Sequence, residues 1–337
     1  MNIFDVMRSL AALLAAFAFL AVLQACGGAE PNAPRQREAS LTLDFRPNAV
    51  HTGIYAAQGS GALSREGIDL EIREPSATAQ PARLLAAGRT DFAVLDVADL
   101  ATARSQGLPL TAVAAIVEKP LAAVVVGPGS SGTPDTYLDG ATVGVTGTPS
   151  DDLVLDTVLD AQGLTTEDVE RINVGFGAVP ALTAGRLDAA TAFWNSEGVQ
   201  LRLSGVPSQE LRVERFGAPE YPQLLLAVNE RITSPGSELV CSVVTGLRQG
   251  NRLAVSEPNR GLDYLMEAIP SLDRRLQKAQ LRALVASSAL PPSVTADPGS
   301  LRAWLDWSVE GGLFRAEQKP AIEKMIQTAG SRCAQSS

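Results

Sequence analysis

The chain has few of the side chains that carry most enzyme chemistry. Its 337 residues include one histidine, His51, and three cysteines. A relay between two histidines is therefore excluded, and so few cysteines and histidines cannot build a Cys/His zinc site without carboxylates. The sequence contains neither a phosphate-binding loop nor a dinucleotide-binding glycine pattern. We therefore expect no metal, no cofactor and no hydrolytic active site.

Positive charge is also scarce. Lys and Arg total 28 against 37 Asp and Glu, so the formal net charge is −9 and the pI is near 4.8. Phosphate binding needs a basic face, so nucleic acid is not an expected partner. Hydrophobic residues make up 45% and charged residues 19% of the chain, which is typical of a globular protein. The length favours about two domains.

An apolar run from Leu10 to Leu23 lies close to the N-terminus, after Arg8. It is too short to span a bilayer comfortably and is typical of a signal-peptide core. The run ends in Leu23-Gln24-Ala25-Cys26, which resembles the bacterial lipobox, where the cysteine is acylated and becomes the new N-terminus. We predict a signal peptide over 1–25, lipidation at Cys26 and a tether over 26–40. An ordinary secretory leader is the alternative.

Strands and helices alternate twice along the chain. Apolar runs, helix-start residues and closing glycines predict a first lobe over 41–126 and a second over 127–228. The remainder, 229–337, is almost entirely helical and should complete the first lobe. Strand–helix alternation predicts an α/β fold in which each lobe is a mostly parallel sheet flanked by helices. The chain would cross between the lobes near 126–129 and near 228–231, and two crossings form a hinge.

Cys241 and Cys333 would lie in an oxidising compartment after export. They form either a structural disulfide or two separate thiols, and the sequence leaves both open. A nucleophilic thiol is not supported, because the only histidine lies far away in the sequence.

Several motifs resemble one family when taken in order. They are Asp44–Tyr55, Gly61–Glu71, Gln106–Pro120, Val174–Leu182, Trp194–Gly198 and Tyr221–Glu230. Together they resemble the periplasmic pyrimidine-precursor binding proteins of thiamine salvage, which are solute-binding components of ABC transporters. That family shares its fold with the fungal thiamine-pyrimidine synthases. The similarity implies a two-lobe periplasmic-binding-protein fold, type II-like, with the ligand between the lobes.

The departures from the family pattern concern the ligand and the chemistry. The family usually has tryptophan where Phe45 stands and a small or polar residue where Arg46 stands, which bears on ligand identity rather than on fold. The synthases carry a lysine for pyridoxal phosphate and a histidine consumed in the reaction. Leu95 and Asp99 stand at those positions, and the cysteine-rich segment of the synthases is absent. The resemblance therefore implies transport, not catalysis.

The candidate ligand-binding residues lie at expected strand ends and helix starts: Phe45, Asn48, His51, Tyr55, Ser150, Trp194, Asn195 and Glu197. Trp194 would stack on a flat ligand, Glu197 would accept from an amine and a ring N–H, and the first four would form the opposing wall. Each has a structural alternative. The aromatic residues could belong to the core, Asn48 could cap a helix, His51 could be a satisfied buried imidazole, and Glu197 could be a solvated loop charge. Glu118 and Asp96, at strand ends in the first lobe, are weaker candidates.

The sequence thus predicts a monomeric, lipid-anchored solute-binding protein of the cell envelope. It would deliver a small heteroaromatic ligand to the permease and ATPase subunits of an ABC importer, and the resemblance implies an aminopyrimidine precursor of thiamine. One alternative is a receptor of the same fold for a sulfonate, a nitrate-like anion or a flavin precursor. The other is a synthase-type enzyme, against which Leu95 and Asp99 argue.

Replacing Cys26 tests the predicted anchor. In the Cys26→Ser variant we expect the protein to move from the membrane pellet to the soluble fraction, because the acyl chains would be its only strong apolar anchor after cleavage. Fractionation followed by immunoblotting measures this, with Gly28→Ala as a control that keeps the lipobox. A Cys26→Ser protein that stays in the pellet contradicts the lipobox interpretation.

Overall fold

The computed structural model describes residues 36–76, 80–128, 137–175, 177–326 and 333. The predicted signal peptide, the lipidation site at Cys26 and most of the predicted tether lie outside these residues. None of the helices in the described ranges is long and apolar enough to cross a membrane.

The first strand starts earlier than the sequence suggested. Strand β1 spans Arg37–Thr42 and pairs in parallel with β2, Ile68–Arg73. The end of the predicted tether is therefore part of the first sheet. Its first two residues are exposed and polar, while Ala39 onward is buried. The run of apolar residues that predicts a strand therefore begins later in the sequence than the strand itself.

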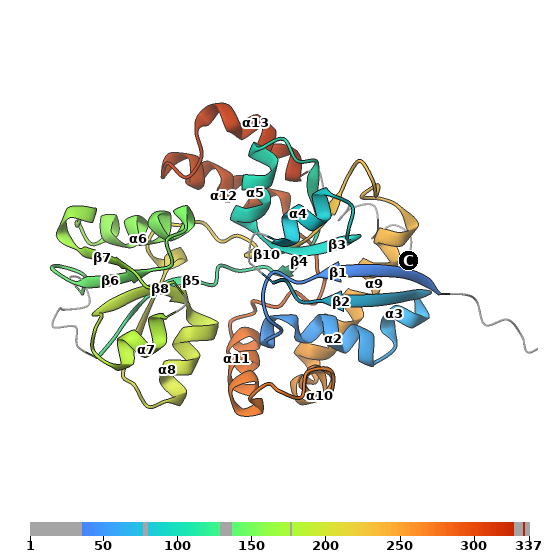
Figure 1. Cartoon of the computed structure of the whole chain (residues 1–337), viewed down its shortest axis with the longest axis horizontal. Coiled ribbons are helices and arrows are strands. Elements are labelled where there is room, and N and C mark those ends of the chain that lie inside the picture. Colours follow the sequence, from blue (N-terminus) through green and yellow to red (C-terminus); the bar gives the residue numbers. More distant parts are fainter. Residues whose placement is uncertain (1–35, 77–79, 129–136, 176, 327–332, 334–337) are drawn as a thin grey trace, which may run out of the picture. The chain divides into compact units, whose positions relative to one another are not determined.

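The first sheet has the strand order β2-β1-β3-β10-β4 (Figure 1). Its remaining strands are β3 (Phe92–Asp96), β4 (Leu110–Val117) and β10 (Leu224–Asn229). Strands β2, β1 and β3 run parallel, whereas β10 is antiparallel to both β3 and β4. The sheet is therefore mixed, and β10 enters it from more than 100 residues further along the chain than β4.

The second sheet repeats this arrangement with the order β7-β6-β8-β5-β9. Its strands are β5 (Ala122–Val126), β6 (Thr142–Val145), β7 (Glu170–Asn173), β8 (Ala189–Phe193) and β9 (Gln209–Arg212). Strands β7, β6 and β8 are parallel, and β5 runs antiparallel to β8 and β9. Each sheet thus contains one antiparallel strand that lies next to the chain's passage between the lobes.

Strand pairing corrects two assignments made from the sequence. The segment Ala122–Val126 was assigned to the first lobe, yet it pairs in the second sheet; Leu224–Val228 was assigned to the second lobe, yet it pairs in the first. The passages between the sheets are therefore 118–121, here the first crossing, and 213–223, here the second crossing. Both strands are uniformly buried, so no alternation marks the sheet to which they belong.

The apolar core forms two clusters, one on each face of the sheets. Successive strand residues point to opposite faces, and accordingly Val94 of β3 lies in one cluster and Leu95 in the other. The first cluster includes residues of α2 (Thr52–Gly59), α3 (Ala62–Arg65), α7 (Ala178–Thr183), α8 (Val199–Leu203), α9 (Glu238–Ser256), α10 (Pro258–Ala268) and α11 (Arg274–Ala286). The second includes residues of α4 (Gln80–Ala86), α5 (Val97–Ser105), α6 (Pro149–Ala161), α12 (Pro298–Glu310) and α13 (Lys319–Ile322).

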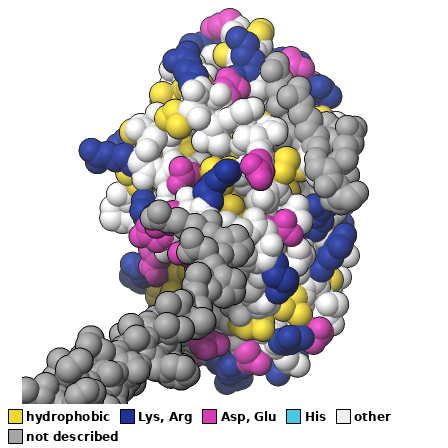
Figure 2. All heavy atoms as spheres, turned by 90° about the vertical axis from the view of Figure 1, so that its right-hand side faces the viewer, with side chains coloured by type: hydrophobic (Ala, Val, Ile, Leu, Met, Phe, Trp, Pro, Cys, Tyr) yellow, Lys and Arg dark blue, Asp and Glu magenta, His cyan; other side chains and the backbone are white. Residues whose placement is uncertain are grey.

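The C-terminal region is helical, as predicted, and α9 packs closely on α2 of the first lobe (Figure 1). Close approach depends on Gly250, where an added Cβ would lie 2.1 Å from the carbonyl oxygen of Gly53. On the face shown in Figure 2, basic and acidic side chains are interspersed and hydrophobic side chains are scattered. The described part of that face therefore carries no basic patch suited to nucleic acid.

Cys241 and Cys333 form a disulfide, with a Cα–Cα distance of 5.0 Å and a sequence separation of 92 residues. Of the two possibilities that the sequence left open, the structure has the bridge. It joins α9 to the C-terminal segment, and Cys333 is buried against the first core cluster.

The disulfide should contribute substantially to stability. A loop of this length is worth about 4 kcal/mol in the chain-entropy model, so the Cys241→Ala/Cys333→Ala double variant should unfold at lower denaturant concentration. Denaturation with and without reductant measures this, and the double variant provides the control because reductant should leave it unchanged. Alkylation of both thiols in unreduced protein would contradict the bridge.

Candidate functional site

The loop after β1 is held by a network around His51. This buried imidazole accepts a hydrogen bond at Nδ1 from the backbone N–H of Asn48 (3.2 Å), so its proton is on Nε2, which donates to the carboxylate of Asp44 (2.8 Å). The Asn48 side chain accepts from the N–H of Val50 (3.0 Å) and donates to the carbonyl of Arg46 (3.0 Å). The contacts of His51 are therefore those of a buried structural histidine, and the contacts of Asn48 are those of a helix cap.

The two aromatic candidates of this region differ in exposure. Tyr55 is buried in α2, and burial, with a smaller effect from the charge of Glu74, raises its pKa to about 12. Phe45 is 38% exposed. Of the four candidates in the first lobe, Phe45 is thus the one that presents a large apolar surface to solvent.

Three carboxylates interact at this edge of the first sheet: Asp44, Asp96 and Asp99. Asp96 ends β3 and caps α5, accepting from the N–H of Ala98 at 2.8 Å. Its pKa is raised to about 7, first by burial and then by the charges of Asp99 and Asp44. The pKa of Asp99, which still reaches solvent, is raised to about 6 by partial burial and by Asp44. Such an edge favours hydrogen-bond donors or cations over anions.

In the second lobe, the turn before α6 is closed by Asp151. Its carboxylate accepts from the backbone N–H of Thr146 at 2.6 Å and also from the Thr146 hydroxyl. The predicted site residue Ser150 lies in the first turn of α6, with its hydroxyl 3.1 Å from that of Thr148. The carboxylate at this helix start opposes the binding of an anion to the free backbone N–H groups.

The other second-lobe candidates lie on a π-turn, Trp194–Gly198, which directly follows β8. Trp194 is only 1% exposed, its indole N–H donates to the carbonyl of Pro120 at 2.9 Å, and the guanidinium of Arg212 lies 3.9 Å from its ring centroid. The structure therefore places this ring in the core rather than in a stacking wall. The exposed ring is that of its neighbour Phe193, at 38%.

Phe193 was not among the residues predicted from the sequence, although a signal was present. Side chains alternate in direction along a strand, so the two adjacent aromatic residues at the end of β8 should point in different directions. Chain position alone did not say which of Phe193 and Trp194 points outward.

Asn195 and Glu197 are the polar candidates of the π-turn. The Oδ1 atom of Asn195 is buried and has no hydrogen-bond partner among the described residues. A carboxylate oxygen of Glu197 accepts from the N–H of Phe193 at 3.0 Å, and burial raises the pKa of Glu197. The turn therefore combines an unsatisfied acceptor with a second, desolvated acceptor, an arrangement that suits a ligand with N–H donors.

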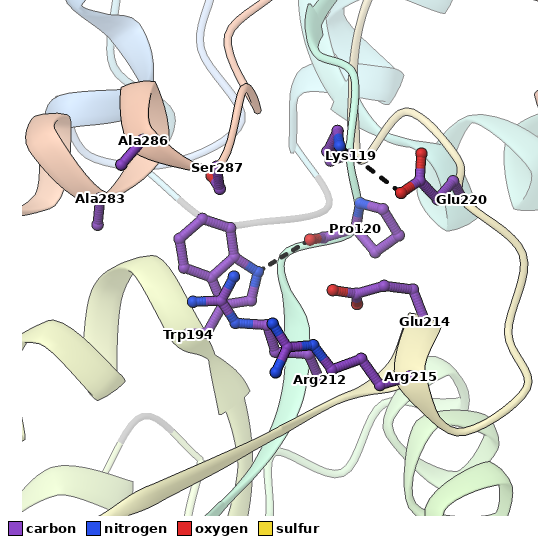
Figure 3. A pocket seen from close by; sticks show the side chains of 10 residues that line it. All are labelled: Lys119, Pro120, Trp194, Arg212, Glu214, Arg215, Glu220, Ala283, Ala286 and Ser287. Carbon is purple, nitrogen blue, oxygen red and sulfur yellow. Dashed lines mark hydrogen bonds and ion pairs between the residues drawn. The ribbon is translucent and has the colours of Figure 1, made fainter.

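A cavity of about 600 Å³ lies at the hinge (Figure 3). It is lined by both crossings, by α11 and by second-lobe residues: Lys119, Pro120, Trp194, Arg212, Glu214, Arg215, Glu220, Ala283, Ala286 and Ser287. Of the residues predicted from the sequence, Trp194 alone lines it, and its indole points to the Pro120 carbonyl with Arg212 alongside.

Leu95 and Asp99 are the residues predicted from the sequence to stand at the positions of the synthase lysine and histidine. Leu95 is 2% exposed in β3, where it pairs with Leu225 of β10. Asp99 lies in the first turn of α5. Neither side chain can form an imine with pyridoxal phosphate. In the part of the chain that the structure describes, no three His, Cys, Asp or Glu side chains are grouped to hold a metal ion.

Comparison with known proteins now decides the family. The model of the family described as NMT1/THI5 like matches residues 48–261, which is more than half of the chain. The chain belongs to the NMT1/THI5-like family.

Members similar to this NMT1/THI5-like chain include binding proteins and synthases. The chain is 31% identical over 255 residues to the formylaminopyrimidine-binding protein of Halalkalibacterium halodurans, covering 75% of this chain and 77% of that protein. It is 33% identical over 237 residues to a putative thiamine biosynthesis protein of Haemophilus influenzae, covering 70% and 75%. It is 22% identical over 252 residues to the 4-amino-5-hydroxymethyl-2-methylpyrimidine phosphate synthase THI5 of Saccharomyces cerevisiae, covering 72% and 74%.

Solved structures confirm the fold. The periplasmic aliphatic sulphonate binding protein SsuA of Escherichia coli superposes with a TM-score of 0.68 at 16% identity, covering 86% of this chain and 91% of that one. At this identity the likeness establishes the periplasmic-binding-protein fold and nothing about the ligand.

The raised pKa values of Asp96 and Asp99 predict the pH dependence of stability. An aspartate titrates near pH 3.9 when unfolded, so a higher folded pKa stabilises the fold at low pH, and this contribution is lost progressively as pH rises from about 4 to the folded pKa values of about 6 and 7. We expect the free energy of unfolding to fall by about 1–3 kcal/mol over that range.

The Asp99→Asn variant should reduce this slope, because it removes one titrating group and one charge that raises the pKa of Asp96. Denaturation at several pH values measures the slope. Asp139→Asn, at an exposed turn position, is the control that should match the parent protein. A slope that is the same in all three proteins would show that these carboxyl groups titrate normally.

Proposed function

We propose that this protein is the extracytoplasmic, lipid-anchored solute-binding component of an ABC importer and that it binds an aminopyrimidine precursor of thiamine. One observation carries the ligand assignment. Asn195, with its buried unsatisfied oxygen, and Glu197 share one turn beside the exposed ring of Phe193. The similarity to a formylaminopyrimidine-binding protein supports the same assignment.

The chemistry of an aminopyrimidine matches these groups. Its exocyclic amine donates two hydrogen bonds, which the Asn195 oxygen and the Glu197 carboxylate can accept. Its flat ring can pack against an aromatic side chain, which contributes about 0.5–1.5 kcal/mol beyond burial. Phe193 in the second lobe and Phe45 in the first are the exposed rings at the two strand ends. We propose that they flank the solute when the lobes close.

The electrostatics disfavour the anionic alternatives. Asp44, Asp96 and Asp99 interact at the first-lobe edge, and Asp151 occupies the start of α6. A sulfonate or nitrate-like anion would meet these carboxylates without a compensating cation among the predicted ligand residues. A flavin precursor is uncharged and heteroaromatic, so binding measurements must separate it from the pyrimidines.

A transport role rather than a catalytic one fits the residues at the synthase positions. Leu95 and Asp99 supply neither the lysine nor the histidine of that chemistry. We propose that the protein acts as a monomer that hands its solute to a permease, with Cys26 acylated at the membrane. Adjacent permease, ATPase and thiamine genes would agree with this role.

Titration calorimetry tests the ligand. Hydroxymethylpyrimidine or its formylated aminomethyl analogue should bind, whereas taurine should not, and thiamine and riboflavin complete the series. In Glu197→Gln the affinity for the bound pyrimidine should fall about 10- to 100-fold, equivalent to about 1–3 kcal/mol, because the amine loses a charged acceptor. Glu167→Gln, at an exposed position in the same lobe, should bind normally.

Two results would contradict the ligand assignment. One is binding of taurine, or of riboflavin alone, without binding of the pyrimidines. The other is an affinity that Glu197→Gln leaves unchanged, since the proposed amine recognition requires this carboxylate.

A further inference from the structure

Gln223 lies in the second crossing, just before β10, and both polar atoms of its side chain form hydrogen bonds. The residue is 5% exposed. Its Oε1 atom accepts from the backbone N–H of Leu121 in the first crossing at 2.9 Å, and its Nε2 atom donates to the carboxylate of Asp96 at 2.7 Å. Its own carbonyl accepts from the N–H of Val97 at 3.0 Å. One amide thus joins both crossings to the end of β3.

The hydrogen bonds continue from the first crossing into the second lobe. The carbonyl of Leu121 accepts from the backbone N–H of Trp194 at 3.0 Å, and the preceding carbonyl, that of Pro120, accepts from the Trp194 indole. Trp194 is the first residue of the π-turn that carries Asn195. Backbone and side chain of one residue are therefore fixed to the segment that Gln223 holds.

We propose that Gln223 is a positioning residue for solute binding, which fixes the Asp96 edge of the first lobe and the Asn195–Glu197 turn of the second lobe relative to each other through the hinge. The inference rests on the proposed function, because it assumes that these edges contact the solute. Preorganised groups bind with less loss of conformational freedom. Loosening the amide should therefore weaken binding although Gln223 does not touch the solute.

The chemistry of an amide is required at this position. Leu121 presents a donor and Asp96 an acceptor, so the side chain between them must accept on one side and donate on the other. An ionised glutamate would accept from Leu121 but would oppose Asp96 with a second negative charge. A protonated glutamic acid supplies both an acceptor and a donor, as glutamine does.

Asp96 also interacts electrostatically with ionisable groups on the elements around it. Asp99 lies in α5, Asp44 follows β1, and Tyr221 lies in the second crossing. None of them brings positive charge to offset a second carboxylate. A glutamate at position 223 should therefore be tolerated at low pH and disfavoured at high pH.

Three variants test the inference: Gln223→Met, which removes both hydrogen bonds, Gln223→Glu, and the matched control Asn229→Leu. Asn229 is a buried amide at the other end of β10, which donates to the carbonyl of Ala86 at 3.0 Å and accepts from the N–H of Arg231 at 3.1 Å. The control loses comparable hydrogen bonds of the same strand but none at the hinge.

We expect Gln223→Met to lower the affinity for the pyrimidine that the parent protein binds by about tenfold or more, whereas Asn229→Leu binds normally at a similar loss of thermal stability. Gln223→Glu should bind nearly normally at pH 5.5 and weakly at pH 8. Recovery at low pH would show that the hydrogen bonds of this side chain, and not its volume, are required, because the volume does not change with pH. Equal affinities in Gln223→Met and Asn229→Leu would overturn the inference.

Hydrogen exchange without any solute supplies an independent measurement. In Gln223→Met the amides of Leu121 and of the Trp194–Gly198 turn should lose protection together, while Asn229→Leu should leave both protected. Loss at Leu121 with an unchanged π-turn would overturn the inference. If the parent protein binds none of the solutes tested, the proposed ligand fails, and the exchange data alone decide whether Gln223 holds the turn.

Discussion

The insertion of β10 between β3 and β4 is the constraint on which the rest of the structure depends. This strand is buried along its whole length and, among the strands that the structure describes, it is the one that joins β4 to the rest of the first sheet. It follows the entire second lobe in the chain, so the first sheet cannot be completed until the chain has returned. Its non-local pairings carry a loop-closure cost that local contacts do not. The first lobe is therefore completed by a strand that the chain reaches only after the second lobe.

The same topology determines where polar groups can lie in the hinge. The first crossing is a short segment, and its backbone groups cannot all be satisfied within a sheet. Gln223 and Trp194 provide the missing partners from the second crossing and the second lobe. The hinge is consequently a hydrogen-bonded layer, next to a cavity lined by charged residues, and not a loose linker.

The candidate site separates aromatic and polar roles between neighbouring residues. Phe193 is exposed while Trp194 supports the turn from within the core, and the following Asn195 and Glu197 offer acceptors. In the first lobe, the His51 network shapes the loop that carries Phe45. Both edges are rich in acceptors, which is the physical basis for proposing an amine-bearing heteroaromatic solute within a family that also contains synthases.

The sequence by itself determined most of the order of strands and helices, the two-lobe architecture, the helical C-terminal region and the family, because periodicity, helix caps and motif order depend on neighbouring residues; it did not predict the short strand β9. It also located the Asn195–Glu197 turn. Only the tertiary structure decided that β5 belongs to the second sheet and β10 to the first, and that Cys241 pairs with Cys333. It also decided that Phe193 rather than Trp194 faces outward and that Gln223 joins the two crossings. These features depend on contacts between residues far apart in the chain, and a uniformly apolar strand or a single glutamine carries no local mark of its distant partner.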